Sequence, residues 1–84
     1  MKRVALVKFL RGSFDTEYSY FTYIEDLKKG DLVLVQANSS YSLAKFQRYT
    51  SNKIHEEKAE KWIIKNLQLD IDAFEGDFIL EWKN

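Results

Sequence analysis

The residues that could do acid–base or metal chemistry are few and poorly grouped. The chain of 84 residues has one histidine, His55, beside Glu56 and Glu57, and it has no cysteine. A transition-metal site usually needs three or four ligands, so this cluster predicts a solvated loop and not a metal centre. Asp70 and Asp72 have no partner of complementary chemistry nearby in the sequence, and such pairs are mostly surface charges or helix caps. We therefore expect neither a glycosidase nor a nuclease.

Nucleophilic and phosphate-binding motifs give no stronger signal. Ser39, Ser40 and Ser42 lie in or beside a turn, and His55 is the one base of the right type, far away in the sequence. Neither glycine-rich phosphate motif occurs, and the chain has only three glycines. The sequence predicts a protein that is not an enzyme and needs no cofactor.

Aromatic and basic side chains form a third group, and they alternate along the same segments. Exposed rings can stack on bases while Lys and Arg neutralise phosphates, and exposed tyrosines equally suit a protein partner. The opposing interpretation is that a small barrel fills its core with these rings. The candidate binding residues are Tyr18, Tyr20, Tyr41, Lys8, Arg11, Lys45 and Arg48.

The elements that must position these residues are short strands. Runs of β-branched and aromatic residues bounded by turn signals predict a β-strand wherever they occur. Gly30 before one such run is expected to take a positive φ, and Asn38-Ser39-Ser40 predicts the turn of an antiparallel hairpin. The predicted strands are residues 4–10, 17–24, 32–35, 41–49 and 62–67.

Two segments are harder to assign. Residues 50–61 are polar and lack an apolar stripe, which predicts an exposed loop with at most one helical turn. Residues 69–74 suit a helical turn or a bent extension, residues 78–82 suit a helix end or a sixth strand, and Gly76 predicts a break between them. The apolar residues of this tail are expected to pack on the barrel or to contact a partner; they are Leu69, Ile71, Phe74, Phe78, Leu80 and Trp82.

These elements predict a mainly β protein: a small antiparallel β-barrel or sandwich of about five strands with a short C-terminal helix or extension. We expect one domain over residues 1–84, with a barrel core at about 2–68 and an extension at about 69–84. The short apolar runs argue against a membrane span and a signal peptide, so the cytoplasm is the expected compartment.

The net charge is zero, but it is unevenly distributed. Residues 1–65 hold twelve basic and eight acidic side chains, whereas residues 66–84 hold one and five. A chain with no net charge has no long-range attraction to nucleic acid or to an anionic membrane. The acidic tail is a candidate to dock on the basic body.

Four motifs stand out along the strands: Tyr18-x-Tyr20-Phe21, the block from Leu27 to Val35 that contains Gly30-Asp31, the block from Tyr41 to Phe46, and Lys61-Trp62-Ile63-Ile64. Together, over about residues 2–74, they resemble the YorP-like family of small bacteriophage and prophage proteins. That resemblance implies that the fold is a small SH3-like antiparallel β-barrel and that the protein has a phage or prophage origin, and none of the motifs is catalytic. The strand pattern of residues 4–49 is also similar to the amino-terminal DNA-end-binding domain of the primosomal helicase PriA, which is an analogy of fold only.

The expected function is a non-enzymatic protein–protein interaction or adaptor module, active as a monomer and without contact to a membrane. The alternative is a module for single-stranded DNA or RNA that uses surface tyrosines with Lys and Arg. Basic residues gathered on one face beside an outward tyrosine would favour nucleic acid, with binding that weakens as salt rises. An exposed aromatic groove rimmed by acidic residues would favour a protein partner.

Overall fold

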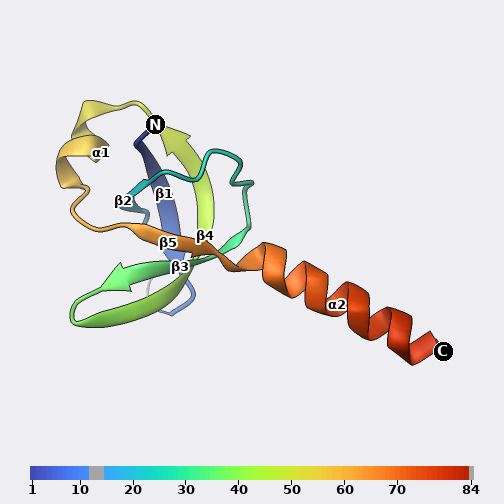
Figure 1. Cartoon of the computed structure of the whole chain (residues 1–84). Helices are drawn as coiled ribbons and strands as arrows, with labels where there is room; N and C mark the ends of the chain where they lie inside the picture. Colours follow the sequence, from blue (N-terminus) through green and yellow to red (C-terminus); the bar gives the residue numbers. More distant parts are fainter. Residues whose placement is uncertain (12–14, 84) are drawn as a thin grey trace.

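The computed structural model describes residues 1–11 and 15–83, and it has five strands and two helices in that part of the chain (Figure 1). The five-stranded sheet and the hairpin are confirmed. The elements are β1 (Arg3–Phe9), β2 (Tyr18–Thr22), β3 (Leu32–Ala37), β4 (Ser40–Thr50), α1 (Lys53–Lys58), β5 (Ile63–Asn66) and α2 (Leu67–Lys83).

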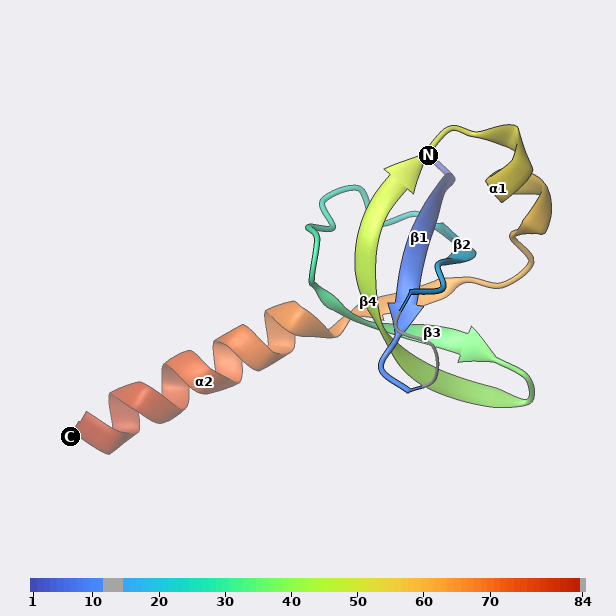
Figure 2. The ribbon, with the colours of Figure 1, turned by 180° about the vertical axis from the view of Figure 1, so that it is seen from behind.

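The strands form one antiparallel sheet in the order β2-β1-β4-β3-β5, which curls into a half-barrel (Figures 1 and 2). The curl brings the two edge strands together, because Phe21 of β2 forms a bridge to Trp62 just before β5. The Phe21 N–H donates to the Lys61 carbonyl at 2.9 Å. The fold is therefore mainly β and consistent with a small SH3-like barrel.

Alternation along the strands fills the core. In β3, Val33 and Val35 are fully buried, and they face Ala44 and Phe46 of β4 and Val7 of β1 in the same apolar cluster. Residues between them point to the outside of the sheet, since successive side chains of a strand alternate. The β4 pairing with β1 shifts between Leu6 and Val7, so that Gln47 is an extra residue in β4.

The turn before β3 follows the prediction from Gly30. Its φ is +92°, a region that L side chains rarely adopt. The Gly30 N–H donates to the Phe46 carbonyl at 2.8 Å, and the Asp31 N–H donates to the Lys28 carbonyl at 2.9 Å. The Asp31 carboxylate in turn accepts from the Lys28 N–H at 2.9 Å. The turn is therefore closed by its own backbone and anchored to β4.

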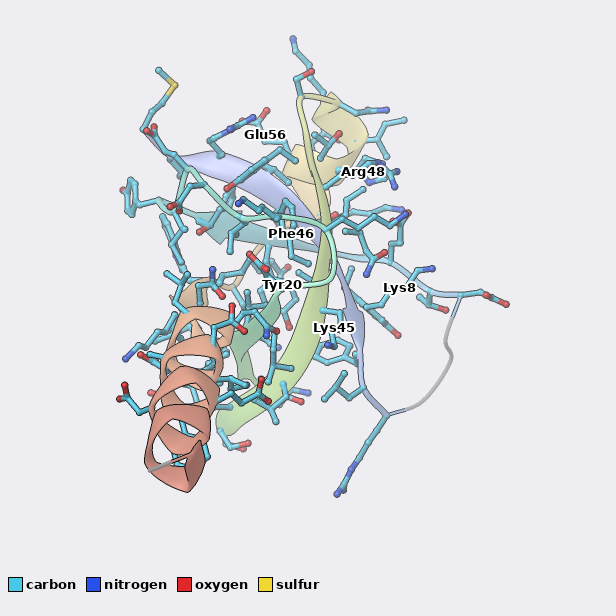
Figure 3. All side chains as sticks on the ribbon, turned by 90° about the vertical axis from the view of Figure 1, so that its right-hand side faces the viewer. Lys8, Tyr20, Lys45, Phe46, Arg48 and Glu56 are labelled. Atoms are coloured by element: carbon cyan, nitrogen blue, oxygen red, sulfur yellow. The ribbon has the colours of Figure 1, made fainter. Side chains whose placement is uncertain are left out.

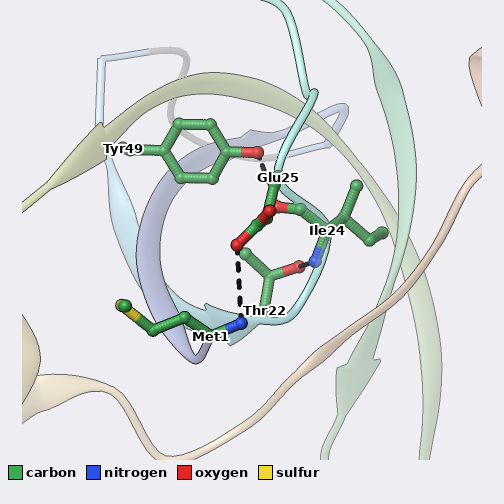
Figure 4. Close-up of polar contacts among 5 residues, drawn as sticks. All are labelled: Met1, Thr22, Ile24, Glu25 and Tyr49. Carbon is green, nitrogen blue, oxygen red and sulfur yellow. Dashed lines mark hydrogen bonds and ion pairs between the residues drawn. The ribbon is translucent and has the colours of Figure 1, made fainter.

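Tyr49 ties the connection between β2 and β3 to the sheet (Figure 4). Its hydroxyl donates to the Ile24 carbonyl at 2.6 Å and accepts from the Leu27 N–H at 3.0 Å. The N-terminal ammonium of Met1 adds an exposed contact of 3.4 Å to Glu25. One half-buried ring thus supplies two polar anchors for this segment, and the Thr22 hydroxyl adds a third by accepting from the Ile24 N–H at 3.0 Å.

Helix α1 has no buried residue, in line with the predicted lack of an apolar stripe. It is six residues long, and the Asn52 side chain caps it by accepting from the Ile54 N–H at 2.9 Å. The segment that the sequence predicts to be an exposed loop with at most one helical turn therefore contains a short capped helix.

The predicted break at Gly76 and the possible sixth strand at 78–82 are wrong, because α2 runs through both as a helix of 17 residues. A glycine inside a helix costs only about 0.5–1 kcal/mol relative to alanine, and the chain has no proline to end the helix. The barrel ends at Asn66, close to the predicted boundary, and the extension is longer and more regular than expected.

A small polar network, which we call the polar joint, fixes the start of α2 and consists of Asp31, Asn66 and Gln68. The Asn66 Oδ1 caps the helix by accepting from the Gln68 N–H at 3.0 Å, and its Nδ2 donates to the Asp31 carboxylate at 3.2 Å. The Gln68 Oε1 accepts from the Leu32 N–H at 3.2 Å. From this joint α2 extends away from the barrel, and the molecule measures 52 × 28 × 24 Å (Figures 1 and 2).

Candidate functional site

Tyr20 belongs to the core, which corrects its assignment as a surface binding residue. Its side chain is 6% exposed, and its hydroxyl donates to the Gln36 carbonyl at 3.0 Å. Burial, and secondly the neighbouring Tyr18, raise the pKa of Tyr20 above its ordinary value of 10.0. In β2, Tyr20 faces the barrel interior because it pairs with Ala5, which is also buried.

The Tyr20→Phe variant is expected to be less stable by about 0.5–1.5 kcal/mol at neutral pH, since one buried hydrogen bond is lost. The raised pKa means that the protonated hydroxyl stabilises the fold below about pH 10, and that this contribution is lost as pH rises through the folded-state pKa. Urea unfolding at neutral pH and above pH 10 should therefore show a difference between the two proteins that shrinks with pH. A difference that stays constant would contradict the role of this hydroxyl.

Tyr18 lies in a groove between β2 and the segment that contains α1. It is 44% exposed, and its ring meets Phe9 edge-on at 4.9 Å. The groove has a volume of about 390 Å³, and its rim carries charges of both signs. No group of three or more metal-ligating side chains occurs in the described residues. The groove is lined by Glu17, Tyr18, Ser19, Tyr20, His55, Lys58, Glu60 and Lys61.

Most of the other predicted residues come together on the outer surface of the sheet. Lys8 pairs directly with Lys45, and the next pair along the strands, Phe9 with Ala44, points into the barrel. Both lysines therefore lie on the outer surface. Figure 3 shows Lys8, Lys45 and Arg48 on one side of β4, with Phe46 and Tyr20 on the other.

A row of leucines crosses the same outer surface. Leu34 of β3 pairs with Leu43 of β4, and the Leu10 N–H lies 3.4 Å from the Leu43 carbonyl. Leu43 is 40% exposed and Leu10 is 42% exposed. Tyr41, two residues before Leu43, is 63% exposed on the same side of β4. We call this surface the basic–leucine face: Lys8, Leu10, Leu34, Tyr41, Leu43, Lys45 and Arg48.

Arg11 lies at the edge of the basic–leucine face. Together with Leu10, Tyr41 and Leu43 it lines a cavity of about 420 Å³. The structure thus gathers Lys8, Arg11, Tyr41, Lys45 and Arg48 on one surface and separates Tyr18 and Tyr20 from them.

The charges of the basic–leucine face are only partly compensated. Arg48 forms an ion pair of 2.7 Å with Glu17. Lys8 and Lys45 are directly opposite each other, and no ion pair joins either of them to another of the described residues. Like charges in this cross-strand position repel each other, so an anionic group placed between them would be favoured.

Sequence reasoning missed three features. The leucine row gave no signal, because its residues lie in three segments and meet only through strand register. The second feature is an aromatic cluster around Trp62. Tyr23 stacks on Trp62 with 4.9 Å between the ring centres, and the Phe21 ring lies 5.4 Å from that of Trp62. The Lys2 ammonium lies over the Phe21 ring at 4.5 Å. This aromatic cluster covers the line where β2 meets β5.

The third missed feature is the single continuous helix α2, whose apolar residues the sequence predicts to pack on the barrel or to contact a partner. Leu69 is 61% exposed and Phe74 is 69% exposed on a helix that also carries Asp72, Glu75 and Asp77. Asn66 was the available signal: an asparagine followed four residues later by an aspartate in the first helical turn is typical of a helix start.

No family model, curated protein or solved structure matches this chain. Within the described residues, no helix is both long enough and apolar enough to cross a membrane.

Proposed function

We propose that this protein is a non-enzymatic protein-interaction module that binds an acidic, amphipathic protein segment on its basic–leucine face. The resemblance of its motifs to the YorP-like proteins supports a place in phage or prophage biology. No cofactor takes part.

The observation that carries this proposal is the pairing of leucines with uncompensated lysines on one face. Leu34 and Leu43 are opposite each other on adjacent strands, and Lys8 and Lys45 are opposite each other one row away. A partner with an apolar stripe would remove the leucines from water, at about 25 cal/mol for each Å² of apolar surface. Acidic residues beside that stripe would lie next to the lysines, which fixes the orientation of the partner.

Single-stranded nucleic acid is the second candidate, because Lys8, Arg11 and Lys45 gather near the exposed ring of Tyr41. Phosphates would neutralise the cations, and a base would stack on the ring. Two features rank this candidate second. Glu17 already compensates Arg48, and the leucines between Tyr41 and Lys45 provide neither a stacking surface nor hydrogen bonds.

Fluorescence anisotropy with three labelled probes tests the proposal. The probes are an acidic amphipathic peptide with Leu and Glu at helical spacing, the same peptide with Lys in place of Glu, and a short single-stranded DNA. We expect the acidic peptide to bind best, and we expect Lys8→Glu combined with Lys45→Glu to weaken it at least about tenfold, because two charge attractions become repulsions.

The matched control is Lys53→Glu combined with Lys58→Glu, which makes the same change of net charge on α1. This control should leave the affinity for the acidic peptide nearly unchanged. Equal binding of the acidic and basic peptides would refute the proposed protein partner. Tighter, salt-sensitive binding of the DNA would move the assignment to the nucleic-acid alternative.

A further inference from the structure

Helix α2 has the chemistry that the basic–leucine face requires. Ile71 and Phe74 are three residues apart and so share one helix face, and Glu75 and Asp77 lie on either side of it. The protein therefore contains both an acidic helix with an apolar pair on one face and a basic surface with leucines.

The dimensions also agree. A helix of 17 residues is about 25 Å long at 1.5 Å per residue. The stretch of β4 from Tyr41 to Arg48 covers seven residue steps, or about 23 Å along an extended strand. One α2 helix is thus long enough to follow the whole basic–leucine face.

The helix does not cover the face of its own chain. The polar joint fixes its first turn beside β3, and the Lys65 ammonium holds the Asp70 carboxylate at 3.0 Å. Figure 3 shows α2 on one side of β4 and the labelled Lys8 and Lys45 on the other. Folding α2 back onto its own face would break the joint, so α2 can reach such a face only on another molecule.

We propose that α2 of one molecule docks on the basic–leucine face of a second copy, and that the reverse contact closes a two-fold symmetric dimer. This inference rests on the proposed function and names its partner as the same chain. The charges fit, since residues 1–65 carry an excess of four basic side chains and residues 66–84 an excess of four acidic ones. Two equal contacts leave no free helix, so the assembly stops at two chains.

Sedimentation equilibrium over a range of protein concentrations and at two salt concentrations measures the association. We expect the mass to rise from 10.0 kDa toward twice that value with concentration. The association constant should fall by about tenfold or more at the higher salt concentration, because charge pairs contribute to the contact. A dimer in this experiment would show that the monomeric state predicted from the sequence is wrong.

A charge-exchange pair of variants tests which surfaces meet. Lys8→Glu with Lys45→Glu makes the face acidic, and Glu75→Lys with Asp77→Lys makes the helix basic. Each double variant alone should remain monomeric, because its helix and face then carry like charges. An equimolar mixture of the two should dimerise, since both contacts regain opposite charges. Circular dichroism checks that each variant is folded, and Lys53→Glu with Lys58→Glu should dimerise as the original protein does.

The inference is overturned if the protein is monomeric at every concentration, if either double variant alone dimerises like the original, or if the mixture stays monomeric. These results are distinct from failure of the proposed function. A monomer that still binds the acidic peptide on its basic–leucine face keeps the interaction module and loses only the dimer. A monomer that binds no acidic peptide refutes both.

Discussion

Replacing Phe46 with alanine is expected to remove most of the free energy of unfolding of the protein. The Phe46 side chain is 2% exposed, belongs to the apolar cluster of the barrel and lies 4.8 Å from the Tyr49 ring. Removing a buried phenylalanine costs about 3–5 kcal/mol. Since a domain of this size has only about 5 kcal/mol or little more to lose, the variant should keep a folded far-ultraviolet circular dichroism signal without denaturant and unfold at very low urea.

Two controls separate lost packing from a general effect of substitution. Phe46→Leu keeps most of the buried volume and should cost about 1–1.5 kcal/mol, with a cooperative unfolding transition. Tyr41→Ala removes a ring that is 63% exposed and should change stability by no more than about 0.5 kcal/mol. If Phe46→Ala instead unfolded at the same urea concentration as Tyr41→Ala, the packing of the barrel core would have to be different.

Replacing Asn66 with alanine is expected to lower the free energy of unfolding by about 2–3 kcal/mol. The change removes a helix cap, which is worth about 0.5–2 kcal/mol, and a half-buried hydrogen bond to the Asp31 carboxylate. Amide hydrogen exchange should quicken in the first turn of α2, at Gln68 above all, because its N–H loses its acceptor. The β1–β4 pairing should keep its protection relative to the lower global stability.

Asn52→Ala is the matched control, because Asn52 also caps a helix by accepting a backbone N–H two residues later. It is exposed and has no second bond comparable to the one between Asn66 and Asp31. Its loss should therefore cost about 1 kcal/mol or less. Equal effects of the two substitutions would show that the polar joint contributes nothing beyond ordinary capping.

The strands could be predicted because their information is local. Val33 and Val35 alternate with exposed positions, Gly30 needs its positive φ, and Asn38-Ser39 closes a hairpin. Helix α2 was missed because its apolar residues are not confined to a single face and a glycine interrupts the pattern. Asn66 together with Asp70 is a sequence signal of a helix start, but Asn66 also ends a strand-like run, and its bond to the Gln68 N–H is seen only in the structure.

The candidate site could be predicted only in part, for a different reason. The cations were found from their residue types, but their gathering depends on the pairing of Lys8 with Lys45, which is set between strands far apart in the sequence. Tyr18 and Tyr20 are the same residue type two positions apart in β2, so the sequence does not distinguish them. In the structure, Tyr20 is buried and donates to the Gln36 carbonyl, whereas Tyr18 is 44% exposed. The leucines opposite each other likewise follow from pairing between strands, in this case from the register of β3 and β4.

The extra residue in β4 sets the phase of everything that follows it. Before Gln47, even-numbered residues such as Ala44 and Phe46 point inward, and after it the odd-numbered Tyr49 does. If Gln47 were instead paired as an ordinary strand residue, with no bulge, strict alternation would turn Arg48 toward the interior and Tyr49 toward water. The Tyr49 hydroxyl could then no longer bind Ile24 and Leu27. The bulge at Gln47 thus keeps Arg48 on the cationic outer surface while Tyr49 anchors a loop on the opposite side.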